Sequence, residues 1–93
     1  MILNYERVGS GSPLVLIHGL GSARTIWKLV IPRLSENFDV IAVDLPGHGA
    51  TPFPDNTAMS PRDLAAHVAE TLDSIGVSQA HLVGNSLGGW TAL

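Results

Sequence analysis

The spacing of apolar and polar positions along the chain predicts four strands. Residues 14–17 and 39–44 contain continuous apolar runs, which are typical of strands covered on both faces of a parallel sheet. Residues 2–8 alternate roughly between apolar and polar, which indicates an edge strand. A further apolar run at 80–83 predicts the last strand.

Helical periodicity separates these strands. Apolar residues recur at helical spacing within 22–37, but Pro32 lies among them, so we expect this helix to be broken or to start late. A second helix is expected from Ser60, a capping residue followed by proline, to a stop at Gly76. Its predicted apolar stripe consists of Leu64, Val68, Leu72 and Ile75.

The alternation of strands and helices predicts an α/β fold, with a mostly parallel sheet of about four strands, right-handed crossovers and flanking helices. Ligands of such sheets bind beyond the carboxyl ends of the strands. Three glycine-rich segments leave those ends, after Ile17, Asp44 and Val83. We therefore expect the functional site to be formed by these three segments.

The segment Gly84-Asn85-Ser86-Leu87-Gly88 is the strongest candidate for a catalytic site. A serine nucleophile projects its hydroxyl from a sharp strand-to-helix turn, and glycines at 84 and 88 remove clashes with the neighbouring strand and helix. The alternatives are an ordinary glycine-rich turn and a phosphate cradle. The glycine spacing does not match G-x-G-x-x-G, and no Gly-Lys-Ser/Thr follows, which disfavours the cradle. We predict that Ser86 is the nucleophile.

The segment His18-Gly19-Leu20-Gly21 directly follows the first buried strand. An acyl-transfer oxyanion needs two preorganised N–H donors. We expect one from Leu87, after the nucleophile, and the other from Leu20. The alternative is a plain strand-to-helix turn. For Asp44-Leu45-Pro46-Gly47-His48-Gly49 a structural interpretation is favoured, in which the Asp44 carboxylate accepts N–H bonds from its own turn.

These three motifs, in this order and at these intervals, resemble the α/β-hydrolase superfamily, in particular its serine esterase-like branch. The resemblance covers essentially residues 1–93 and implies the N-terminal part of that fold, through the nucleophile elbow and into the following helix. It implies hydrolysis of ester-like small molecules through an acyl-serine intermediate, with no cofactor and no metal. Members with an aspartate nucleophile match less well, because the elbow carries Ser86.

The triad order in this fold is serine, acid, histidine, so both partners are expected downstream of Ser86. Residues 87–93 contain neither an acid nor a histidine. Of the four histidines, we expect His18 to brace backbone, His67 and His81 to lie away from the site, and only His48 to merit a test as base. We therefore expect the chain alone to be inactive. The alternatives are a non-catalytic, self-associating fragment and one half of a split enzyme, completed by a C-terminal half.

Composition narrows the functional classes to which the protein could belong. The net charge is −3 and no basic run is present, which disfavours nucleic-acid binding. With no cysteine there is neither a disulfide framework nor a thiolate metal site. No signal-peptide pattern and no apolar run of membrane-spanning length occur in the sequence, so we expect no membrane partner and a cytoplasmic location.

Overall fold

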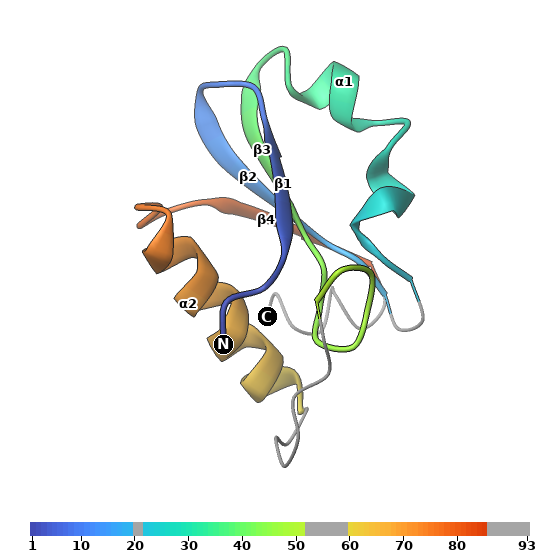
Figure 1. Cartoon of the computed structure of the whole chain (residues 1–93). Coiled ribbons are helices and arrows are strands. Elements are labelled where there is room, and N and C mark those ends of the chain that lie inside the picture. The colour runs from blue at the N-terminus through green and yellow to red at the C-terminus, as the bar shows by residue number, and fades with distance from the viewer. Residues whose placement is uncertain (20–21, 52–59, 86–93) are drawn as a thin grey trace.

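The computed structural model describes residues 1–19, 22–51 and 60–85. Within them the chain forms a four-stranded sheet with helices packed on both faces (Figure 1). The strands are β1 (Tyr5–Val8), β2 (Ser12–Ile17), β3 (Phe38–Val43) and β4 (His81–Gly84). The helices are the 3-10 helix η1 (Arg24–Trp27), α1 (Ile31–Leu34) and α2 (Pro61–Ser74).

The sheet has the order β1-β3-β2-β4, and its register brings three strand ends to one level. β2 pairs in parallel with both β3 and β4, whereas β1 pairs antiparallel with β3. Ile17, at the end of β2, lies opposite both Val43 and Gly84. The prediction of a mostly parallel sheet is therefore confirmed, and the carboxyl ends that carry the glycine-rich segments lie side by side.

The direction of the two crossovers explains why the helices cover opposite faces. The chain passes from β2 to β3 on one side, then returns across β2 to reach β4. Right-handed connections in opposite directions place their helices on opposite sides of the sheet. Accordingly, α2 packs on one apolar cluster with Val15, Ile17 and Ile41, while η1 and α1 pack on a second. That second cluster contains Leu14, Leu16, Ile31, Val40 and Ala42, with Trp27 packed against it.

The ends of the helices follow from local sequence. Pro32 lies in the first turn of α1, where a backbone N–H would have no partner within the helix, so proline is tolerated there. The helix that was expected to be broken or to start late is accordingly observed as η1 followed by the short α1. α2 begins with a capping box in which the Ser60 hydroxyl accepts from the Asp63 amide. Gly76, at φ +78°, follows its last turn, as predicted.

The first strand is shorter than the alternation predicted. β1 begins only at Tyr5, because the preceding residues turn toward α2. Leu3 is 1% exposed and its amide donates to the Thr71 hydroxyl at 2.8 Å, far along the chain on α2. A tertiary contact therefore replaces strand pairing at the N-terminus.

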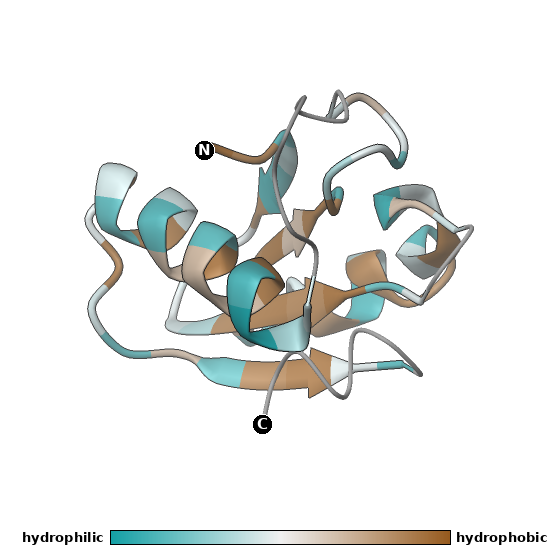
Figure 2. Ribbon diagram, turned by 90° about the horizontal axis from the view of Figure 1, so that it is seen from below, coloured by the Kyte–Doolittle hydropathy of each residue, from teal (hydrophilic) through white to brown (hydrophobic). Residues whose placement is uncertain are grey.

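β4 lies at one edge of the sheet. Its apolar residues Leu82 and Val83 are 44% and 43% exposed, although neighbouring strand β2 is buried. Figure 2 shows this apolar strand at the margin of the sheet. In the part of the chain that the structure covers, no helix combines the length and apolar character that crossing a membrane requires.

Candidate active site

The predicted catalytic residues flank the described part of the site. Leu20, Ser86 and Leu87 lie outside the described residues. The residues next to them do not: the Asn85 amide donates to the Ile17 carbonyl at 3.1 Å, which continues the β2–β4 pairing one step beyond Gly84. Asn85 therefore lies beside the point where His18-Gly19 leaves β2.

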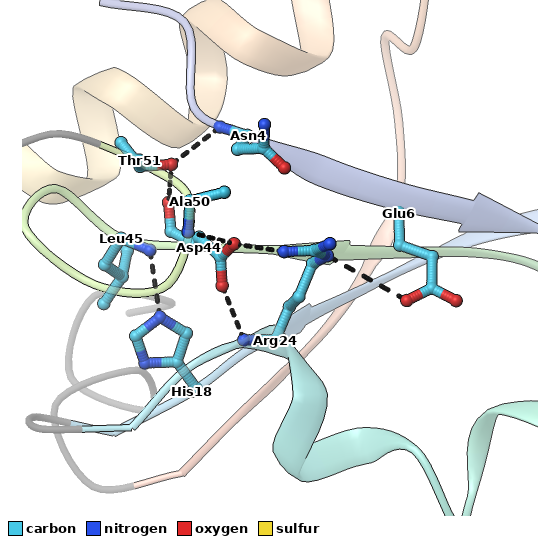
Figure 3. A network of polar contacts seen from close by, with 8 residues as sticks. All are labelled: Asn4, Glu6, His18, Arg24, Asp44, Leu45, Ala50 and Thr51. Atoms are coloured by element: carbon cyan, nitrogen blue, oxygen red, sulfur yellow. Dashed lines mark hydrogen bonds and ion pairs between the residues drawn. The ribbon is translucent and has the colours of Figure 1, made fainter.

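His18 is buried, at 0% exposure, and both of its ring nitrogens are used. Nδ1 donates to the Gly19 carbonyl at 2.7 Å, and Nε2 accepts from the Leu45 amide at 2.9 Å (Figure 3). An imidazole that accepts at one nitrogen is neutral. Burial, the dominant influence, also lowers the pKa of His18. The prediction that His18 braces backbone is confirmed.

Asp44 is a second fully buried polar residue at the strand ends. Its carboxylate accepts from the Arg24 amide at 2.7 Å, from the Arg24 guanidinium at 2.5 Å and from the Ala50 amide at 3.1 Å. Burial acts to raise the pKa of Asp44, but these hydrogen bonds and the Arg24 charge outweigh it, so the pKa is lowered. Asp44 therefore holds its own turn, as the structural interpretation predicted.

The loop after Asp44 closes around this carboxylate because of one glycine. Gly49 has φ +52°, and a Cβ there would lie 2.3 Å from Asp44 Oδ1. The Thr51 hydroxyl then donates to the Asp44 carbonyl at 2.8 Å and accepts from the Asn4 amide at 2.7 Å. The glycines of this motif thus serve close packing on a buried anion.

Arg24, Thr51 and Asn4 are the members of this network that the sequence did not single out. Arg24 pairs with Asp44 and also approaches Glu6 of β1, with its Nε 3.9 Å from Oε1 (Figure 3). Arg24 begins η1, twenty residues before its partner, and no motif marks it. The only available signal was general: a buried aspartate requires a cationic or N–H partner.

The remaining histidines differ in their distance from the strand ends. The His48 ring lies 5.0 Å from the His18 ring, centroid to centroid, and its Nδ1 donates to the Pro46 carbonyl at 2.9 Å. His81 opens β4 opposite Leu14, at the other end of the sheet, and His67 lies on α2 beside the N-terminal amine. Only His48 therefore lies at the site, as predicted.

The described residues contain no group of three or more histidine, aspartate or glutamate side chains arranged to hold a metal ion. Their arrangement instead offers preorganised backbone. Two loops, after β2 and β3, are tied together by His18 and Arg24, and a third segment, at Asn85, joins them through Ile17. The amides of Arg24, Leu45 and Asn85 that make these ties are bonded to Asp44, His18 and Ile17, so they fix the backbone at this edge of the sheet.

The known proteins that this chain resembles include hydrolases and esterases. The chain is 40% identical to a 2-hydroxy-6-oxo-2,4-heptadienoate hydrolase of Pseudomonas putida, over 97% of this chain and 34% of that protein. It is also 40% identical to a pimeloyl-[acyl-carrier protein] methyl ester esterase of Aeromonas hydrophila, over 99% of this chain and 35% of that protein. Among solved structures, a marine microorganism esterase superposes with a TM-score of 0.92 at 32% identity, over 98% of this chain and 34% of that one.

The chain thus spans about a third of the length of these relatives. The sequence profile described as the alpha/beta hydrolase family matches residues 14–93, from β2 through the predicted elbow. Since the match includes both loops of the buried network and the segment that follows β4, the chain belongs to the α/β hydrolase family of enzymes, of whose fold it is an N-terminal part.

Proposed function

We propose that residues 1–93 form a partial α/β-hydrolase domain whose Ser86 is the nucleophile of a serine hydrolase acting on ester-like carbonyl substrates. The observation that carries the proposal is the Asn85 amide bond to the Ile17 carbonyl. It holds the residue before Ser86 level with the start of the His18-Gly19 loop. A serine and an oxyanion donor must lie at the same strand edge for acyl transfer.

In the proposed reaction the Ser86 hydroxyl attacks the substrate carbonyl carbon and gives its proton to a base. The carbonyl oxygen becomes an oxyanion that accepts from the amides of Leu20 and Leu87. When this intermediate collapses, the alcohol leaves with a proton and an acyl-Ser86 ester remains. Water then hydrolyses that ester and restores the serine.

The proposal assigns the base and the acid to residues outside these 93. His18 is excluded as base because its Nε2 already accepts from the Leu45 amide. Without a base Ser86 is a weak nucleophile, so the chain alone should have little activity. That the relatives are about three times as long supports this assignment.

Ester-like substrates are supported by the relative named as a methyl ester esterase. The relative named as a hydrolase of an oxo-dienoate supports a variant in which the same site acts on another carbonyl compound. Both reactions would use the same nucleophile and the same oxyanion donors, so the labelling experiment described below does not depend on the choice of substrate.

A second candidate is a non-catalytic chain that associates through β4, with itself or with a complementary C-terminal half. It is favoured by the exposure of Leu82 and Val83 on an edge strand, since unpaired apolar edges bind other strands. If the chain is one half of a split enzyme, it still contributes Ser86, and this second candidate becomes compatible with the first.

Labelling by a fluorophosphonate tests the nucleophile. We expect no labelling of the chain alone. We expect labelling at Ser86, and ester hydrolysis, when the chain is joined to the C-terminal two thirds of the Aeromonas hydrophila esterase, where we expect the acid and the base to lie. Ser86→Ala should abolish the labelling and should lower kcat for ester hydrolysis by at least about 10³-fold. Equal hydrolysis by the Ser86→Ala chimera would refute the assignment.

A further inference from the structure

The first residues of the chain are held against α2, as Figure 1 shows. Leu3 is 1% exposed, belongs to the apolar cluster beneath α2, and donates its amide to the Thr71 hydroxyl at 2.8 Å. That hydroxyl in turn donates to the His67 carbonyl at 2.9 Å, one turn earlier in the helix. Met1 packs against the same cluster. The N-terminal amine is therefore kept beside α2.

The amine lies between two side chains of α2. It donates to His67 Nδ1 at 3.2 Å and forms an ion pair with the Glu70 carboxylate. Residues three apart on a helix are neighbours on its surface, so His67 and Glu70 extend from the same face of α2. An amine nitrogen, an imidazole nitrogen and a carboxylate oxygen therefore meet at one place, and each is a group that binds metal ions.

The protonation of these groups directs their lone pairs toward one another. An ammonium group has no acceptor, so His67 Nδ1 must accept and the ring proton resides on Nε2. Nε2 is buried and has no hydrogen-bond partner in the part of the chain that the structure describes. The hydrogen bond from the amine lowers the pKa of Glu70, which keeps it a carboxylate at neutral pH. Once the amine releases a proton to solvent, all three groups offer a lone pair.

The spacing of the two nitrogens fits a transition-metal ion. Metal–nitrogen bonds are about 2.0–2.1 Å long, which separates two nitrogens on one ion by about 2.9 Å at a right angle and about 3.3–3.4 Å at the tetrahedral angle. The distance from the amine nitrogen to His67 Nδ1, 3.2 Å, lies between these values. Ca²⁺ and Mg²⁺ take oxygen ligands, whereas a mixed nitrogen and oxygen set suits Cu²⁺, Ni²⁺ and Zn²⁺, of which Cu²⁺ is bound most tightly.

We propose that the N-terminal amine, His67 and Glu70 form a binding site for Cu²⁺. Only two of the three ligands are side chains, and the main-chain amine is the third. The Glu70 side chain is 52% exposed, so the ion enters from solvent and water completes its coordination. Binding replaces a proton of the ammonium group, which passes to solvent. The site does not depend on the proposed hydrolase function, because the bound ion joins the start of the chain to α2 and touches no substrate.

Titration of the 93-residue chain with CuCl₂ tests the site, at about pH 8 and with glycine as a competing chelator. We expect one bound ion per chain, with an electron paramagnetic resonance spectrum that shows coupling to nitrogen. His67→Asn should weaken binding about tenfold or more. One glycine added before Met1 moves the amine by about 3.8 Å and should have a similar effect. His81→Asn, on exposed β4, is the matched control and should bind as the parent does.

Thermal unfolding gives a second measurement, because an ion bound by the folded chain alone raises the midpoint. Cu²⁺ should raise the midpoint of the parent and of His81→Asn but not that of His67→Asn, whose transition without Cu²⁺ shows that it is folded. No binding to the parent would overturn the proposal. Equal affinity of the parent, His67→Asn and the extended chain would show an adventitious ion only and would also overturn it. A loss in His81→Asn as large as in His67→Asn would place the ion elsewhere.

Discussion

Two single residues in this protein show how hydrogen bonds offset the free-energy cost of burying a polar side chain. Asp44 and His18 are both 0% exposed, and each is hydrogen-bonded largely to backbone groups. Burial of an unpaired charge or hydrogen-bonding group would cost several kcal/mol. Their hydrogen bonds join the loop that follows β2 to the loop that follows β3.

Both residues predict that stability falls with acid, in two stages. The folded-state pKa of His18 lies below its ordinary 6.5, so the unfolded chain binds the extra proton first. Stability is then lost as the pH falls from about 6.5 toward that lowered value. The pKa of Asp44 lies below its ordinary 3.8, so its contribution is present above that value and is lost as the pH falls through the folded pKa.

Urea unfolding of the 93-residue chain between pH 3 and 8 measures this dependence. His18→Asn should remove the first stage, whereas His81→Asn, on exposed β4, should leave it unchanged. A first stage that persists in His18→Asn would show that another group titrates there.

At the scale of elements, the loop after β3 depends on glycine for a reason that differs from that at the end of α2. Gly49 and Gly76 both have positive φ, +52° and +78°. At Gly49 a Cβ would meet the Asp44 carboxylate at 2.3 Å, whereas at Gly76 it would meet nothing within 4 Å. The two positions therefore share backbone strain and differ in packing.

This difference predicts unequal losses from the same substitution. Gly76→Ala should lower the free energy of unfolding by about 1–2 kcal/mol, the cost of the left-handed conformation for a residue with a side chain. Gly49→Ala should lower it by about 3 kcal/mol or more, because the clash displaces a buried anion from its partners. Chemical denaturation of both variants checks this, and similar losses would show that the loop yields without disturbing Asp44.

For the whole molecule, the unbalanced feature is β4. β2 and β3 are paired on both sides, whereas β1 and β4 are edge strands with one partner each. On β4 the apolar residues Leu82 and Val83 are 44% and 43% exposed. Family members of about three times this length provide more chain to cover such an edge. We propose that the isolated chain covers it by association.

Sedimentation velocity over a range of concentrations should show the mass of the chain rising with concentration. Leu82→Lys should shift the rise to higher concentration, because a charged side chain on an edge strand opposes pairing. Leu29→Lys, at a residue that is 92% exposed between η1 and α1, is the matched control and should change little. Equal shifts in both variants would indicate general apolar adhesion rather than pairing at β4.

Local patterns in the sequence were sufficient for much of this fold. The apolar runs predicted β2 and β3, the Ser60 cap and Gly76 predicted both ends of α2, and the three motifs predicted the family. These features depend on residues close together in the chain, where spacing alone carries the physics. The placement of Ser86 and of its two amide donors remains a prediction.

Only the tertiary structure decided which distant residues meet. The antiparallel pairing of β1, the shortened start of that strand, and the partnership of Arg24 with Asp44 join segments up to tens of residues apart. The bond from Leu45 to His18 is of the same kind. Such contacts arise because the sheet brings strand ends to one level, and a hydrogen bond across that edge leaves no periodic mark in the sequence.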